Sequence, residues 1–312
     1  MGKKNLEELI LKNPMSLKEI KKYYDIKIKD VRTMIDDKRV EGYDIQQVKA
    51  KGHNKFYINN AVKQFGNEYE VDLAPDEPFA LIGDTHLGSK FADIDTLHEF
   101  YDIARDRGVN KVFHAGDMIE GMNVYRGQLN DLEVYGVDAQ IDYATLNYPK
   151  KGGLETLLIS GNHDLKMFEK DGIDPTKHIA ANRSDITYLG QLSRRVKLGD
   201  NINLQLVHGS GGSAYARSYK SQVFLRNSPP DLHPDILAMG HFHTSYWIPE
   251  EQGTEVFNVG CFMHESDYLV RKGMYSVIGG WIVDAHGNEN GIDNIKAEFL
   301  KFNRDYNARK VA

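Results

Sequence analysis

Leu157-Leu158-Ile159-Ser160-Gly161-Asn162-His163-Asp164 is the stretch of sequence that decides the fold. The apolar residues at its start predict a buried strand, and Gly161 lets the chain turn where that strand ends. An amide, an imidazole and a carboxylate then follow at residues 162–164. Because α/β proteins place their functional groups on loops at the carboxyl ends of strands, this stretch predicts an α/β protein whose chemistry lies there.

Four further motifs of the same kind surround this stretch, and each follows a short apolar run. In two of them, side chains two positions apart lie on one side of an extended chain, so both can face one cluster. Imidazole, carboxylate and amide groups are ligands of divalent Mn, Fe or Zn, so the motifs predict a metal site. They are Gly83-Asp84-Thr85-His86, Gly116-Asp117, His208-Gly209 and Gly240-His241-Phe242-His243.

In this order, the five motifs resemble those of the calcineurin-like metallophosphoesterases over about residues 79–262. The resemblance implies a four-layer arrangement of helices and strands, a β-sandwich flanked by helices, with a site for two metal ions. It implies that Asp84, His86 and His243 hold one ion, that Asn162, His208 and His241 hold the other, and that Asp117 bridges them. It also implies that His163 is a non-ligand histidine that assists the leaving group and that Asp164 orients it.

The implied activity is metal-dependent hydrolysis of a phosphoester. Two divalent cations can clamp a phosphoryl group and generate the hydroxide that attacks phosphorus in line. We expect Mn²⁺, with Fe, Zn or Ni as alternatives, because all of them accept these ligands. Glu120 stands where the family often has Asp or Asn, so no metal role is assigned to it. An insertion at about residues 121–151 carries Arg126, a candidate phosphate contact whose alternative is an ordinary solvated loop residue.

The sequence pattern of residues 1–60 predicts a separate small domain whose net charge is opposite in sign to that of the rest of the chain. They carry 14 Lys and Arg against nine Asp and Glu, a net charge of +5, whereas the other 252 residues carry a net charge of −11. Leu6, Leu9 and Ile10 have helical spacing, Ser16 and Glu19 form a capping-box pattern, and an apolar period continues from residue 28. Segments in which apolar and polar residues alternate lie on both sides of a turn at residues 51–55, and this pattern predicts a hairpin.

Three helices followed by a hairpin with a basic tip resemble the winged helix-turn-helix family over about residues 3–58. In that family the third helix enters the major groove of DNA. The alternative is a docking or oligomerisation module that could make a homodimer. The resemblance implies that the nucleic-acid contacts come from Lys29, Arg32, Thr33, Lys51, His53 and Lys55.

Residues 61–77 are polar and without a clear period, so we expect a linker there and a second domain over residues 78–312. Within that domain a helix is expected at residues 214–225 and a strand at residues 275–284. No apolar run approaches the ~20 residues that span a bilayer. One cysteine, Cys261, and the lack of a signal-peptide core suit a cytoplasmic protein without a membrane partner.

Several functions are compatible with these expectations. The appended basic domain favours a phosphodiester substrate in nucleic acid, with DNA preferred, and Asp84-Thr85-His86-Leu87-Gly88 resembles the corresponding motif of SbcD-type DNA nucleases. One alternative is a small-molecule phosphatase or cyclic-nucleotide phosphodiesterase, in which the Tyr-rich insertion acts as a lid. Another is a DNA-binding scaffold or regulator with an inactive phosphoesterase domain.

Overall fold

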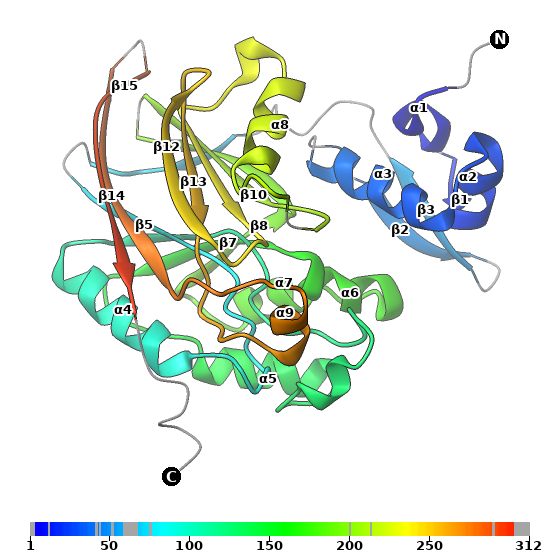
Figure 1. The fold of residues 1–312 in the computed structure, drawn as a ribbon, viewed down its shortest axis with the longest axis horizontal. Helices are drawn as coiled ribbons and strands as arrows, with labels where there is room; N and C mark the ends of the chain where they lie inside the picture. Colours follow the sequence, from blue (N-terminus) through cyan, green and yellow to red (C-terminus); the bar gives the residue numbers. More distant parts are fainter. Residues whose placement is uncertain are drawn as a thin grey trace.

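The computed structural model describes residues 4–11, 13–40, 43, 45–50, 53–58, 68–74, 77–199, 201–212, 214–288 and 291–302. A small unit of residues up to 58 and a larger unit from residue 68 onward make up the chain (Figure 1). Among these residues, no helix is long and apolar enough to cross a membrane.

The small unit contains three helices and a three-stranded antiparallel sheet in the order β1-β3-β2. Ser16 and Glu19 form the expected capping box at the start of α2. Ile10, Ile20 and Ile58 are fully buried and join the helices to the sheet. The helices and hairpin expected from the sequence are therefore present. The elements are α1 (Leu6–Ile10), β1 (Met15–Ser16), α2 (Leu17–Tyr24), α3 (Ile28–Val40), β2 (Ile45–Ala50) and β3 (His53–Ile58).

Two six-stranded mixed sheets form the larger unit. The first has the order β15 (Gly291–Lys301), β14 (Gly279–Asn288), β5 (Phe79–Ile82), β6 (Lys111–His114), β7 (Glu155–Ser160) and β8 (Ile186–Gln191). The second has the order β12 (Ser245–Glu251), β13 (Thr254–Val259), β11 (Ile236–Gly240), β10 (Ile202–His208), β9 (Ser193–Leu198) and β4 (Tyr69–Val71). Strands β5 to β8 run parallel, as do β10, β11 and β13, so their carboxyl ends point the same way within each sheet.

Side chains along β5 alternate between two cores, as the period of two in a strand requires. Phe79 and Leu81 belong to the core between the sheets, whereas Ala80 and Ile82 face the helices α4 (Ile94–Asp106), α5 (Val137–Asn147) and α7 (Pro175–Ala181). On the opposite side, Leu225 of α8 (Tyr219–Asn227) packs in the cluster that covers the second sheet. These four layers confirm the predicted sandwich flanked by helices (Figure 1).

Some elements differ from the sequence expectations. Strand β4 forms inside the segment expected to be a linker, because Val71 is buried where β4 pairs with β9. Helix α8 begins at Tyr219 rather than 214, and β14 runs from Gly279 to Asn288 rather than from 275 to 284. Helices α6 (Asn162–Asp171) and α9 (Asp267–Arg271) and the short 3-10 helices η2 (Gln128–Asn130) and η3 (Pro230–Leu232) were not expected.

Candidate metal centre

The residues of the five motifs meet where parallel strands of both sheets end. Asp84 and Asp117 lie just beyond β5 and β6, and Asn162 begins α6 directly after β7 and Gly161. His208 is the last residue of β10, and His241 follows β11. The two sheets thus deliver their functional side chains to one common edge, as expected for a sheet with parallel strands.

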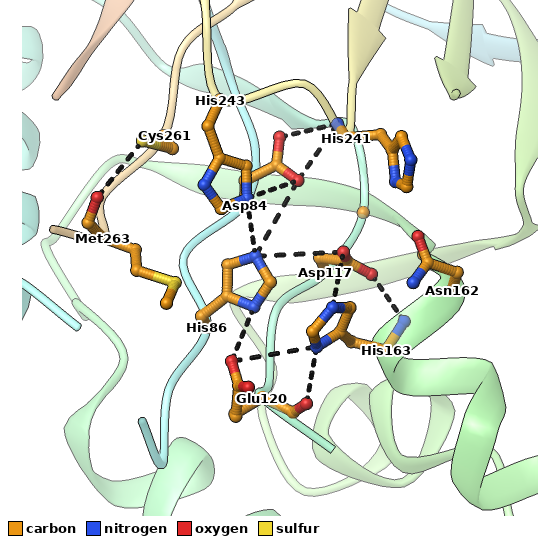
Figure 2. Close-up of polar contacts among 12 residues, drawn as sticks. Asp84, His86, Asp117, Glu120, Asn162, His163, His241, His243, Cys261 and Met263 are labelled. Atoms are coloured by element: carbon orange, nitrogen blue, oxygen red, sulfur yellow. Dashed lines mark hydrogen bonds and ion pairs between the residues drawn. The ribbon is translucent and has the colours of Figure 1, made fainter. Parts of the chain in front are cut away.

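The first group of donor atoms surrounds His86 (Figure 2). His86 Nε2 lies 3.0 Å from His243 Nε2, 4.0 Å from Asp84 Oδ1 and 3.8 Å from Asp117 Oδ2. His243 Nε2 in turn lies 3.7 Å from Asp84 Oδ1. These four side chains are buried, so the donor atoms face one another out of bulk water.

The second group surrounds His208. Its Nε2 atom lies 3.0 Å from Asn162 Oδ1, 3.2 Å from Asp117 Oδ2 and 3.3 Å from His241 Nδ1. Asp117 Oδ2 therefore approaches both groups, and its carboxylate stands between them. The sequence prediction placed these same residues in two groups joined by Asp117.

Both groups fit a small divalent cation. Donor atoms bound to one ion at about 2.1 Å stand roughly 3.0–3.4 Å apart in tetrahedral or octahedral geometry. The distances around His208 fall in this range, whereas those around His86 and His243 extend from 3.0 to 4.0 Å. Nitrogen and oxygen donors without thiolate match Mn, Fe or Zn. The buried His and Asp clusters are thus consistent with a site for two metal ions.

Backbone strain is concentrated at the same positions. Five motif residues have left-handed φ angles: Asp84 (52°), His86 (46°), Asp117 (56°), His241 (85°) and His243 (52°). Such angles are unfavourable for non-glycine residues and cluster at functional sites. The sequence argument assumed that residues two positions apart face the cluster from an extended chain. Instead, the left-handed turns aim each of these side chains at the centre.

Two glycines allow the loops to approach closely. A Cβ atom at Gly161 would lie 2.2 Å from Asp117 Oδ1, and a Cβ atom at Gly116 would lie 2.6 Å from His208 Nδ1. Gly116 also has a φ of +94°. Any side chain at either position would displace a donor residue, which explains why glycine precedes each of these motifs.

Backbone carbonyls orient two of the histidines. His208 Nδ1 donates to the Ala115 carbonyl at 2.8 Å, so its Nε2 atom faces the centre. His241 Nε2 donates to the Gly211 carbonyl at 2.8 Å, so its Nδ1 atom faces the centre. Because a carbonyl can only accept, these bonds set the tautomer that leaves the inward nitrogen as an electron-pair donor.

Glu120 orients His86, a role that the sequence interpretation missed. Its Oε2 atom lies 3.0 Å from His86 Nδ1 (Figure 2). Its Oε1 atom accepts a hydrogen bond from Gln128 Nε2 at 2.7 Å. Glu120 is fully buried. A carboxylate behind a ligating imidazole raises the basicity of that ligand. The feature of the sequence that could have indicated this role is the position of Glu120, three residues after Asp117.

His163 lies beside the centre, in the first turn of α6. Its Nε2 atom is 4.0 Å from Asp117 Oδ2, and its Nδ1 atom donates to the Glu120 carbonyl at 2.7 Å. The expected orienting partner, Asp164, is engaged elsewhere. Its carboxylate accepts hydrogen bonds from the amides of Gly161, Met118 and Ile119, and so ties two motif loops together.

The charges of the site favour a cation. Burial opposes protonation of His86, but Glu120, Asp117 and Asp84 raise its pKa to about 9. Burial also opposes protonation of His208, and Asp117 nevertheless raises its pKa to about 9. Burial raises the pKa of Asp84 to about 7. The same negative field that stabilises these imidazolium ions would stabilise divalent metal ions.

The other predicted contact residues lie elsewhere on the chain. Arg126 is exposed in the insertion, in a hollow lined by residues 123–130. Lys29, Arg32 and Thr33 are exposed on α3, and His53 is exposed at the start of β3. Lys55 donates to the Pro14 carbonyl and lies 3.6 Å from Glu19, so it is engaged within the small unit. Lys51 lies outside the described residues.

Comparison with known proteins agrees with this geometry. A family model described as the calcineurin-like phosphoesterase superfamily domain matches residues 78–275. A protein named DNA polymerase II small subunit from Halobacterium salinarum is 37% identical over 230 residues, covering 61% of this chain and 44% of that protein. A protein of the same name from Thermoplasma acidophilum is 21% identical over 252 residues, covering 68% and 51%.

The chain thus spans about half the length of these curated relatives. Among solved structures, Vps29 from Entamoeba histolytica complexed with Zn²⁺ is similar, with 16% sequence identity and a TM-score of 0.37, covering 72% of this chain and 99% of that one. Vps29 from Chaetomium thermophilum has 13% identity and a TM-score of 0.40, covering 75% and 100%.

Proposed function

Because the chain belongs to the calcineurin-like phosphoesterase superfamily, we propose that it is a metal-dependent phosphodiesterase that acts on nucleic acid, with DNA as the preferred substrate. The observation that carries this proposal is the convergence of seven buried or partly buried donor side chains around Asp117, whose Oδ2 atom approaches both His86 and His208. Asp84, His86 and His243 would hold one divalent ion, and Asn162, His208 and His241 the other.

Two bound divalent ions, with Mn²⁺ proposed, would polarise a phosphoryl group and lower the pKa of water. The chain supplies the groups around them. The Glu120 carbonyl keeps a hydrogen on His163 Nδ1, so Nε2 is the atom that faces the centre. When Nε2 is protonated, it can donate that proton to the oxygen of the leaving group. Asp164 acts as a positioning residue, because it holds the loops of residues 117–119 and 161 in register.

The start of α6 adds a further favourable element. The backbone amide of His163 donates to Asp117 Oδ1 at 2.8 Å and thereby fixes the bridging carboxylate. The positive end of a helix dipole also stabilises negative charge in its first turn. A phosphodiester would therefore meet two cations, an imidazole and a helix N-terminus on the same side of the sandwich.

Nucleic acid is the proposed substrate because of the small N-terminal unit and the relatives. We propose that residues 1–60 form a winged helix-turn-helix domain, residues 61–77 join it to the phosphoesterase domain, and residues 78–312 form that domain. Lys29, Arg32, Thr33 and His53 expose polar groups for phosphate contacts, and Lys51 and Arg126 are further proposed contacts. The relatives are named as DNA polymerase subunits, which supports DNA and another polymerase subunit as partners.

The test uses the full chain, stripped with a chelator and then supplied with Mn²⁺. Substrates are bis-p-nitrophenyl phosphate, p-nitrophenyl phosphate, and single- and double-stranded DNA. We expect turnover of the diester and of DNA, and at least a hundredfold loss of kcat in Asn162→Ala and His163→Ala. Turnover of the monoester alone would reject the diesterase and favour a small-molecule phosphatase.

A second candidate, a non-catalytic subunit of a DNA polymerase, is favoured by the names of the relatives. DNA binding without turnover of any substrate at any Mn²⁺ concentration would support it. The contribution of the small unit is tested separately by Lys29→Ala combined with Arg32→Ala. Losing two phosphate contacts should flatten the salt dependence of DNA binding, by a slope of about 2 in log K against log salt. An unchanged slope would remove α3 from DNA binding.

A further inference from the structure

Two aromatic rings are stacked beside the metal centre, and neither is needed to hold the proposed ions. Tyr125 comes from the insertion after β6, and Tyr268 comes from α9. Their ring centroids are 4.6 Å apart and their planes differ by 21°. The Tyr125 ring also lies 6.3 Å from the His163 ring, on the side of Tyr125 that faces the centre. The stack therefore starts beside the proposed general acid.

The inner ring of this stack is held rigidly. The Tyr125 hydroxyl donates to Asp131 Oδ2 at 2.9 Å and lies 3.4 Å from Glu120 Oε1. Glu120 is the same buried carboxylate that orients His86. The position of the Tyr125 ring is thus coupled directly to the donor set, so the ring has a defined orientation relative to a phosphate bound there.

The outer ring is accessible. Tyr268 is 41% exposed, although it packs against the Tyr125 ring. Lys272 Nζ lies over the Tyr268 ring, 5.8 Å from its centroid, and is an exposed side chain that a base could displace toward its phosphate. An exposed aromatic surface with an adjacent cation matches the chemistry of a nucleotide, which has a flat base and a negative phosphate.

The segment that carries Tyr268 is anchored in the centre at both ends. The Phe262 amide donates to the Asp84 carbonyl at 3.1 Å, and the Val277 amide donates to the His243 carbonyl at 2.8 Å. The intervening residues leave the donor loops, form α9 and return to them. Tyr268 is therefore carried by a segment whose two ends are hydrogen-bonded to the loops of the proposed metal ligands.

We infer that the Tyr125–Tyr268 stack is a platform for the unpaired base of a nucleic-acid strand whose neighbouring phosphodiester lies at the metal centre. This inference rests on the proposed function and narrows its substrate class to single-stranded nucleic acid or the frayed ends of a duplex. A base inside a duplex is stacked on its neighbours and cannot stack on a protein ring. Stacking on an aromatic ring tolerates every base, so recognition here is independent of sequence.

The test compares binding of two phosphorothioate-linked single strands to the full chain with Mn²⁺, using fluorescence anisotropy of a distal label. One strand carries all its bases, and the other is abasic over its central nucleotides. The wild-type chain should prefer the base-bearing strand by roughly 5-fold to 150-fold, the range expected for base stacking on an aromatic side chain. Tyr268→Ala should reduce this preference to about one.

Two controls isolate the ring. Tyr268→Phe keeps the aromatic surface and should keep the preference. Tyr219→Ala removes a tyrosine of similar exposure (48%) from α8 and should also keep it. The inference is overturned if the wild-type chain binds both strands equally or if Tyr268→Ala retains the preference. Failure of the proposed function looks different, because ordinary DNA would then remain uncleaved with Mn²⁺ even while the Tyr268-dependent preference persists.

Discussion

Asp117 illustrates how one residue can determine the chemistry of the site. Burial alone would raise its pKa, but His208 and His163 hold that pKa well below its ordinary value, so the Asp117 side chain is a carboxylate. One of its oxygens accepts the His163 amide, and the other approaches both donor groups. A neutral amide at this position would remove the negative charge that Asp117 brings to the centre.

Glu120 offers a prediction at the same scale. Glu120→Gln keeps the size of the side chain but removes the charge that supports His86, so Mn²⁺ affinity should fall roughly 10- to 100-fold. Mn²⁺ titration followed by electron paramagnetic resonance would measure this change. Glu133→Gln, at an exposed position in the same insertion, should leave affinity within twofold. Equal affinities of wild type and Glu120→Gln would show that Glu120 does not support the metal ligand.

At the scale of elements, Arg183 ties the end of α5 to the first sheet. Its guanidinium donates to the Thr145, Tyr148 and Pro149 carbonyls, which lie at the end of α5 and just beyond. It also donates to both carboxylate oxygens of Asp185, just before β8. Arg183 is only 7% exposed, so these acceptors have little access to water if the side chain is removed.

Arg183→Ala should therefore lower the free energy of unfolding by about 3–5 kcal/mol, measured by urea denaturation at pH 7. Burial opposes ionisation of Asp185, yet Arg183 keeps its pKa below the ordinary value. A lowered folded-state pKa stabilises the fold above the unfolded-state pKa of about 3.9, and this stabilisation is lost as pH falls. The effect of Arg183→Ala should thus shrink below pH 4.

The comparison variant is Arg105→Ala, which removes an arginine that is 45% exposed and pairs with exposed carboxylates on α4. Exposed pairs contribute about 0–1 kcal/mol, so its effect should be small. If Arg183→Ala were no more destabilising than Arg105→Ala, the proposed connection between α5 and β8 would be wrong.

At the scale of the whole molecule, the segment that joins the two units supplies a strand to the second sheet. β4 pairs in parallel with β9 and forms the edge of the second sheet. Val71 and Leu73 are buried in the core between the sheets. The family match begins at residue 78, beyond this strand. The segment between the units therefore contributes to the phosphoesterase sandwich and does more than connect it.

We expect a chain that starts at residue 78 to be less stable than one that starts at residue 68, by about 3 kcal/mol or more, because it loses two buried aliphatic side chains. It should also associate, since the hydrogen-bonding edge of β9 becomes exposed. Urea denaturation and size-exclusion chromatography measure the two effects. Equal unfolding midpoints and a monomeric state for both chains would show that β4 is dispensable.

The sequence was most informative where chemistry is local. The five motifs contain all seven side chains that converge around Asp117, because a strand that ends in glycine and a polar residue can be recognised over four or five residues. Burial of β5 was equally predictable, since its continuous apolar run Phe79–Ile82 indicates a strand that is buried on both faces. The capping box of Ser16 and Glu19 was correct for the same reason.

Only the tertiary structure assigned the remaining roles, because these depend on contacts between distant segments. β4 is stabilised by β9, more than a hundred residues away, and its three residues Tyr69–Val71 are too few to predict a strand by themselves. Asp164 binds the loop after β6 instead of His163, Glu120 orients His86, and Tyr268 stacks on Tyr125 from another segment. The sequence alone predicted which groups lie at the candidate centre, whereas folding decided which of them touch, since contact is a property of three-dimensional packing.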